Sequence, residues 1–112
     1  MWLEYIENLE RVEITEPRSY EICRSLEQCR YASSDDTVLL VRAKWYYWIE
    51  SDGRTRIRFR QNEMCYAYYG GIDFPMLVYA FLSYANNDDA WKEQFEFEEE
   101  PIISDYGIEW FG

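Results

Sequence analysis

The heptapeptide Arg-Thr-Arg-Ile-Arg-Phe-Arg, residues 54–60, has an arginine at every second position. Strict alternation is the pattern of a β-strand, because successive side chains of a strand point to opposite faces of the sheet. The apolar positions of this segment must then pack against a second layer, while the basic positions share the other face. The basic residues are Arg54, Arg56, Arg58 and Arg60.

Two further β-rich segments flank this heptapeptide. Residues 37–50 are dominated by β-branched and aromatic residues and are expected to form one long strand, and residues 64–69 are expected to form another. The intervening residues 51–53 end in Asp-Gly, which is typical of hairpin turns because Gly accepts positive φ. Residues 61–63 form the second turn. The sequence therefore predicts an antiparallel meander over about residues 37–69.

Two segments outside the meander are expected to be helices. In residues 18–31, Ile22, Leu26 and Cys29 fall on one stripe at helical spacing. A second apolar segment with helical spacing covers about residues 74–86. We therefore expect the 112 residues to form a single domain of the α+β class, in which an antiparallel sheet of three to five strands is packed by these two helices.

The ends of the chain admit more than one interpretation. Residues 1–15 combine helical spacing with strand-like alternation, so helix and strand both remain open for this segment. Towards the C-terminus we expect a short helix at residues 90–95, a strand at 95–98, and a strand or ordered tail at 102–111.

Glutamate recurs at every third position near the N-terminus. A helix would align these glutamates in one ridge, since residues three apart are neighbours on its surface. A single strand would place Glu4, Glu10 and Glu16 on one face and Glu7 and Glu13 on the other.

The charge of the chain excludes some classes of partner. The 22 acidic residues outnumber the 11 basic ones, which gives a net charge of −11. The excess lies at the two ends, and residues 42–60 between them are basic. Phosphate repels such a chain, so we expect neither direct binding of nucleic acid nor docking on an anionic membrane.

Acidic residues near the C-terminus are the strongest candidates for a partner-binding surface. They are interleaved with aromatic residues, and Trp and Tyr are enriched at the energetic centres of protein interfaces. Carboxylates without cations nearby repel one another and lower the stability of the fold. A segment that keeps them in spite of this cost is expected to have a function. The candidate partner-binding residues are Asp88, Asp89, Glu93, Glu96, Glu98, Glu99, Glu100, Asp105, Glu109 and Trp110.

The four arginines have a possible internal counterpart. Glu96, Glu98 and Glu100 also alternate, so an acidic ladder and a basic ladder could pair within one chain or between two copies in a homodimer. The other interpretation of the arginines is a site for phosphate or carboxylate groups.

Catalytic motifs are missing from the sequence. It has no histidine, and its three cysteines lack Cys-x-x-Cys spacing, which excludes His-based catalysis and the usual zinc motifs. We therefore expect no enzymatic activity, no cofactor and no metal site. No apolar run reaches the roughly 18 residues of a membrane span and no basic signal-peptide start is present, so we expect a cytoplasmic protein.

The acidic runs at residues 88–109 and 4–16 carry a resemblance to a class of proteins. In size, charge and lack of catalytic motifs the chain resembles phage-encoded DNA-mimic inhibitors, including acidic anti-CRISPR proteins. The resemblance implies an inhibitor in the host cytoplasm, whose carboxylates occupy a basic nucleic-acid-binding surface of a protein or nucleoprotein complex such as a CRISPR effector. The alternative is a generic protein–protein interaction module or a homodimer joined by its Arg and Glu ladders.

Overall fold

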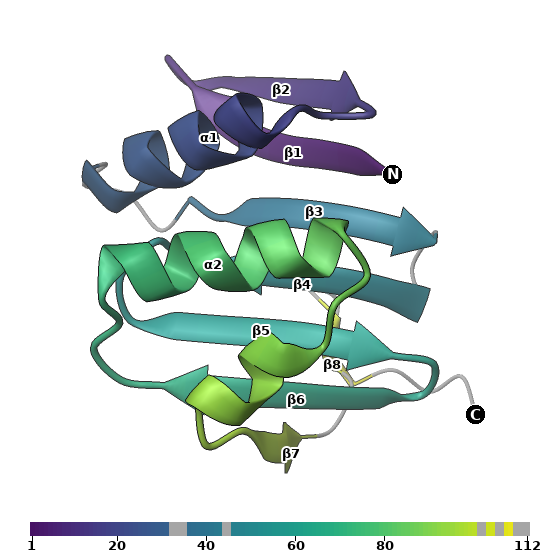
Figure 1. The fold of residues 1–112 in the computed structure, drawn as a ribbon. Coiled ribbons are helices and arrows are strands. Elements are labelled where there is room, and N and C mark those ends of the chain that lie inside the picture. Colours follow the sequence, from purple (N-terminus) through teal and green to yellow (C-terminus); the bar gives the residue numbers. More distant parts are fainter. Residues whose placement is uncertain (32–35, 44–45, 101–102, 105–106, 109–112) are drawn as a thin grey trace.

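The structure is a computed structural model that describes residues 1–31, 36–43, 46–100, 103–104 and 107–108. In this part of the chain, seven antiparallel strands form one sheet in the order β2-β1-β3-β4-β5-β6-β7, and the helices cover one of its faces (Figure 1). The strands are β1 (Trp2–Glu7), β2 (Glu10–Thr15), β3 (Val38–Ala43), β4 (Tyr47–Ser51), β5 (Arg56–Gln61), β6 (Met64–Tyr69) and β7 (Glu98–Glu100). The helices are α1 (Ser19–Tyr31), α2 (Phe74–Ala85) and the short 3-10 helix η2 (Ala90–Gln94).

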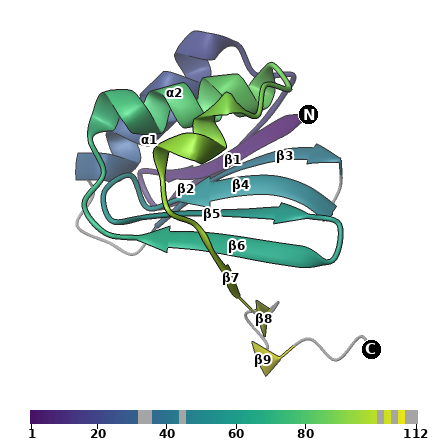
Figure 2. The same ribbon diagram turned by 60° about the horizontal axis from the view of Figure 1, so that its bottom comes forward.

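A separate two-stranded ladder lies on the side of the sheet away from the helices (Figures 1 and 2). It consists of β8 (Ile103–Ser104) and β9 (Gly107–Ile108). The expected strand or tail at 102–111 is thus seen as strand at these four positions, and its other residues lie outside the described part of the chain.

The α+β class is confirmed, but the sheet has more strands than the expected three to five. One reason is the N-terminal segment, which is a β-hairpin rather than one helix or one strand. Asn8 and Leu9 both have left-handed backbones, with φ of 53° and 66°. Two consecutive positive φ values are what a two-residue type I′ turn requires, and this turn reverses the chain without a glycine.

The long strand expected at residues 37–50 is the second difference, and that prediction was wrong. The segment forms two strands, β3 and β4, which pair with each other in antiparallel register, with Leu40 opposite Ile49. The chain therefore reverses between Ala43 and Tyr47. No glycine, proline, asparagine or aspartate stands at the reversal, so the composition of the segment carries none of the usual signals of a turn.

Most of the other predicted elements are confirmed to within a few residues. The arginine-rich strand is β5, the third predicted strand is β6, and the two predicted helices are α1 and α2. The helix expected at 90–95 is the 3-10 helix η2. The strand expected at 95–98 was wrong, because strand pairing begins only at Glu98, where β7 joins β6.

Apolar and polar side chains alternate along the strands, and the apolar ones form the core of the domain together with the helices. The core side chains of the sheet point to the face that α1 and α2 cover, and the helices contribute the apolar stripe expected of them, whereas Cys65 and Ala67 of β6 are buried on the other face. Trp91 of η2 is also fully buried. The largest fully buried apolar side chains are Leu3, Ile22, Leu26, Leu40, Ile49, Ile57, Leu77, Phe81 and Trp91.

The hairpin between β4 and β5 is organised by the carboxylate of Asp52. This carboxylate accepts hydrogen bonds from the backbone N–H of Arg54 (2.9 Å) and of Thr55 (2.8 Å), and from the Thr55 hydroxyl. Burial acts to raise the pKa of Asp52, but these hydrogen bonds favour the ionised form and hold the pKa below the ordinary value of 3.8.

We expect the variant Asp52→Asn to lose about 1–3 kcal/mol of unfolding free energy at pH 7, because hydrogen bonds to an ionised group are lost. The carboxylate contributes stability above its unfolded pKa and loses it as the pH falls through the lower folded pKa. The difference between wild type and variant should therefore shrink as the pH is lowered from about 7 to about 2. Urea unfolding at several pH values measures it.

Asp73→Asn is the matched control for this experiment. Asp73 is exposed at the N-cap of α2, and its side chain makes no capping hydrogen bond. Its replacement should change stability by no more than about 0.5–1 kcal/mol. An equal loss in both variants would contradict the special role of Asp52.

Candidate functional site

The arginines of β5 lie on the sheet face opposite the helices, because Ile57 and Phe59 between them are buried beneath the helices. Arg58 Nε donates to Glu100 Oε1 at 2.8 Å, and Arg58 Nη1 lies 3.6 Å from Glu50 Oε1. Arg56 Nε donates to the same Glu50 oxygen at 3.3 Å. These arginines are therefore neutralised inside one chain.

The contact between Arg58 and Glu100 crosses the intervening strand β6. In the register of the sheet, Arg58 lies opposite Ala67, and Glu100 lies opposite Cys65. These two small residues of β6 leave room for the arginine to reach β7. Tyr69 completes the cluster, since its hydroxyl donates to Glu100 Oε2 at 3.1 Å.

The electrostatics of this cluster favour the charged arginine. Burial acts to lower the pKa of Arg58, but Glu50 and Glu100 raise it, and the net effect is an increase. Burial and the hydrogen bond to Glu100 raise the pKa of Tyr69, so this phenol stays neutral. The cluster therefore holds a fixed ion pair between Arg58 and Glu100 beside a neutral phenol.

The predicted pairing of ladders is thus realised at one position, Arg58 with Glu100. Arg60 instead donates from Nε to the backbone oxygen of Asn62 at 2.7 Å. Arg54 and Glu96 lie outside the strands, because β5 begins at Arg56 and β7 begins at Glu98. Each predicted ladder is therefore one residue shorter than the alternation in the sequence indicated. Glu50 was missed as a partner because it fell within the supposed single strand, although the Asp-Gly turn that follows it brings it opposite Arg58.

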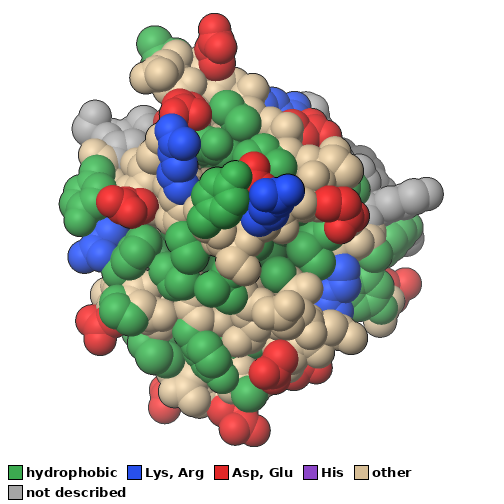
Figure 3. Space-filling model, turned by 45° about the horizontal axis from the view of Figure 1, so that its top comes forward, with side chains coloured by type: hydrophobic (Ala, Val, Ile, Leu, Met, Phe, Trp, Pro, Cys, Tyr) green, Lys and Arg blue, Asp and Glu red, His purple; other side chains and the backbone are tan. Residues whose placement is uncertain are grey.

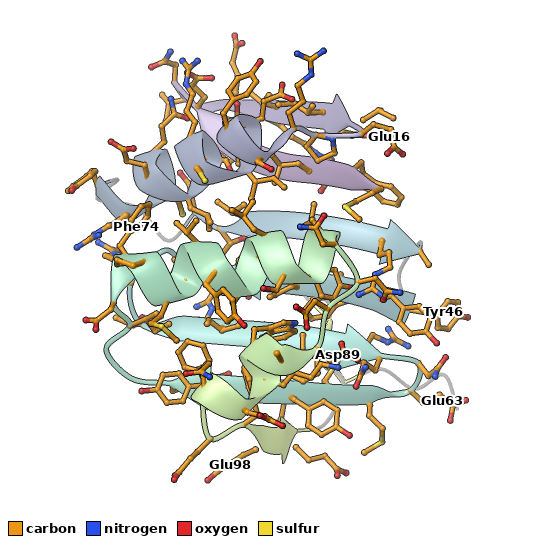
Figure 4. All side chains as sticks on the ribbon, viewed as in Figure 1. Glu16, Tyr46, Glu63, Phe74, Asp89 and Glu98 are labelled. Atoms are coloured by element: carbon orange, nitrogen blue, oxygen red, sulfur yellow. The ribbon has the colours of Figure 1, made fainter. Side chains whose placement is uncertain are left out.

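The acidic residues from the end of α2 through β7 are the principal candidate for an interaction surface. In Figure 4, Asp89 lies at the start of η2, in front of the sheet, and Glu98 lies at the outer edge of the molecule that β7 forms. Among the described residues of this segment, one cation is present, Lys92, whose Nζ lies 3.1 Å from Asp89 Oδ1. We call the exposed acids of this segment the acidic surface: Asp88, Asp89, Glu93, Glu96, Glu98 and Glu99.

The remaining predicted partner-binding residues do not belong to this surface. Glu100 is half-buried and paired with Arg58, which gives it a structural role. Asp105, Glu109 and Trp110 lie outside the residues that the structure describes.

Aromatic side chains attach the acidic surface to the core. The Trp91 ring lies 5.1 Å from that of Phe59 and 5.7 Å from that of Phe97, with both pairs edge to face. Phe59 and Phe97 also meet edge to face, at 4.8 Å. Such pairs stabilise beyond simple burial. The aromatic residues within the acidic surface are thus core anchors that hold the carboxylates in place.

The N-terminal glutamates are arranged differently from either expectation. Because the chain reverses at residues 8–9, Glu4 and Glu13 lie opposite each other on the same face. Arg11 forms ion pairs with both of them. The N-terminal amine lies 3.0 Å from Glu16 Oε1, and Arg24 lies 3.5 Å from Glu7 Oε1.

These pairs compensate much of the charge at the N-terminal edge. In Figure 3, acidic and basic side chains lie next to one another on the upper face, with hydrophobic side chains between them. The N-terminal acids are therefore a weaker candidate surface than those of η2 and β7.

The cysteines are poor nucleophiles. Burial raises the pKa of the Cys29 thiol to about 11, and the thiol lies 3.0 Å from the backbone oxygen of Asp36, to which it donates. Burial also raises the pKa of Cys23 and of Cys65. All three thiols are protonated at neutral pH, and thiols in that state react slowly.

Within the described ranges, no group of three or more Cys, Asp or Glu residues is placed to hold a metal ion. The helices seen in those ranges are all too short or too polar to cross a membrane.

No family model matches the chain, and its comparison with curated proteins and with solved structures gives no match.

Proposed function

We propose that this chain is an acidic inhibitor that binds a basic, nucleic-acid-binding surface of a protein or nucleoprotein complex, of the kind that a CRISPR effector presents. Its carboxylates take the places of backbone phosphates, and its charge steers the encounter. The protein acts in the cytoplasm of the cell that contains its target, and it needs neither catalysis nor a cofactor for this function.

The observation that carries the proposal is the unequal compensation of charge. The arginines Arg56 and Arg58 are paired within the chain, so they do not offset the acidic surface. Residues 88–100 contain seven acids and one lysine, and six of these acids are exposed. Aromatic anchors hold the segment against the core, so little ordering entropy is lost when it binds.

The alternative of a homodimer joined by its ladders has less support. Arg58 finds its partners Glu50 and Glu100 within the same chain, and a second copy is not needed to neutralise it. Size-exclusion chromatography with light scattering distinguishes the two functions. The inhibitor proposal expects a monomer at low and high salt, whereas the ladder dimer would dissociate as salt is added.

A partner isolated from a host lysate at low salt provides the direct test. Its affinity should fall by about tenfold or more between roughly 50 and 300 mM salt, because screening weakens each ion pair. The partner's own nucleic acid should compete for the same surface. The proposal is wrong if affinity is independent of salt, or if nucleic acid and this chain bind the partner together.

Charge reversal locates the surface. The double variant Glu98→Lys/Glu99→Lys should lose at least about tenfold in affinity, since two attractive pairs become repulsive. Glu10→Lys/Glu27→Lys is the matched control, because it changes the net charge equally at two exposed positions outside the acidic surface. Equal losses in the two double variants would indicate an effect of net charge alone, and would contradict the assignment.

A further inference from the structure

A hollow of about 680 Å³ opens on the sheet at the turn between β5 and β6. Its lining residues include Tyr46, Tyr47, Tyr66 and Glu63. Figure 4 labels Tyr46 and Glu63, which lie at the same margin of the sheet. A second, adjoining hollow shares Tyr46, Tyr47 and Asn62 with the first. Neither hollow includes a residue of the acidic surface.

The turn that carries Glu63 is held in place by hydrogen bonds to and from Asn62, one of which runs from its backbone N–H to the Tyr46 carbonyl at 2.9 Å. Tyr47 Oη donates to Asn62 Oδ1 at 2.6 Å, and Arg60 Nε donates to the backbone oxygen of Asn62 at 2.7 Å. Asn62 itself has the positive φ, 55°, that a tight turn needs. The tyrosine rings and the Glu63 carboxylate are thus presented from a fixed backbone.

One ring of the hollow already binds a guanidinium group. The Arg60 guanidinium carbon lies 5.2 Å from the centre of the Tyr46 ring, within the range of a cation–π contact. The Tyr46 side chain is nevertheless 55% exposed, so part of its ring is open to a ligand.

The chemistry of the lining selects a cation. Glu63 is exposed and forms no ion pair with any described residue. The described lining residues include no lysine or arginine, although the Arg60 guanidinium lies beside the hollow against one part of the Tyr46 ring, and the chain as a whole carries −11. A planar guanidinium can stack on a tyrosine ring while it donates two parallel hydrogen bonds to a carboxylate.

We infer that this hollow binds an arginine side chain of the partner protein. The identity of the partner rests on the proposed function, whereas the affinity of the hollow for a guanidinium group does not. The site adds a specific contact to the general attraction of the acidic surface, and it contacts a different part of the partner.

An NMR titration of the full chain with n-butylguanidinium tests the inference. The amide signals of Asn62, Glu63 and Met64 should shift saturably, with a Kd of the order of 10 mM for one exposed cation–π and ion-pair contact. n-Butylurea has the same shape without the charge, and it should bind at least about fivefold more weakly. Methyl glucoside serves as a neutral ligand that can also stack on tyrosine.

The variants Glu63→Gln and Glu27→Gln separate a site from general attraction. Glu63→Gln should weaken n-butylguanidinium binding about two- to fivefold, whereas Glu27→Gln, an exposed position on α1, should leave it unchanged. Thermal midpoints of both variants check that the fold is intact. The inference is overturned by the absence of saturable shifts, by equal binding of the urea, by stronger binding of the glucoside, or by equal effects of the two variants.

The failure of this inference is distinguishable from that of the proposed function. If n-butylguanidinium fails to bind while the partner still binds in a salt-dependent manner, the hollow is excluded and the acidic surface stands. If n-butylguanidinium binds but no salt-dependent partner exists, the guanidinium site stands without the proposed inhibitor function.

Discussion

Replacement of Gly53 by alanine is expected to lower the free energy of unfolding by about 2–4 kcal/mol, from two additive causes. Gly53 has a φ of 85°, a left-handed conformation that is unfavourable for a residue with a Cβ atom. A Cβ at this position would also lie 2.8 Å from the backbone nitrogen of Arg30 and 3.0 Å from its Cα. Backbone atoms of a packed helix cannot move aside as a flexible side chain can.

The effect follows from the packing of the β4–β5 hairpin against the end of α1. Gly71→Ala is a matched control, because a Cβ there would meet no atom within 4 Å and no left-handed φ is involved. This control should be neutral, or stabilise by up to about 1 kcal/mol through the unfolded chain. Urea unfolding followed by tryptophan fluorescence measures both. Similar losses in the two variants would show that the approach to Arg30 is unimportant.

Truncation of Trp91 to alanine has the largest expected effect on stability, a loss of about 3–5 kcal/mol. Trp91 is fully buried and its ring contacts those of Phe59, Phe97 and Tyr84. Its removal leaves a cavity beneath η2 that the surrounding rings cannot fill. The total stability of a domain of this size is about 5–15 kcal/mol, so the variant keeps only a small margin.

Trp91→Ala should also release the segment that carries the acidic surface. Amide hydrogen exchange at residues 91–100 is expected to accelerate more than exchange in β3 and β4, because the anchor of the segment is lost. Tyr20→Ala is the control, since Tyr20 is 63% exposed on α1 and its loss should cost less than about 0.5 kcal/mol. Unchanged protection of residues 91–100 would contradict the anchoring role.

Elements with a strong local pattern could be predicted from the sequence. The alternation around Ile57 identified β5, and the stripe through Ile22 and Leu26 identified α1, because each pattern is complete within a few turns of helix or a few residues of strand. The reversals at residues 8–9 and between Ala43 and Tyr47 were missed. At the first of them the chain turns through left-handed Asn8 and Leu9, where the sequence has no glycine or proline to mark it.

The candidate site likewise has features that could be predicted from the sequence and features that could not. The concentration of acids in residues 88–100 is a property of composition and could be read directly. The roles of Trp91 and Phe97 as anchors could not, since an aromatic residue between acids is equally compatible with a core or an interface. The hollow beside Tyr46 was also missed, because its lining comes from the start of β4 and the residue before it, from the β5–β6 hairpin and from β6.

The sequence by itself determined the α+β class, the arginine-rich strand, both helices and the acidity of the chain. Only the tertiary structure decided which charges remain uncompensated. Arg58 pairs with Glu50 from one neighbouring strand and with Glu100 from beyond the other, and these partners are 8 and 42 positions away in sequence. Periodicity assigns a side chain to a face, but ion pairs depend on which strands are neighbours and in which register, and those are set by long-range packing of the whole sheet.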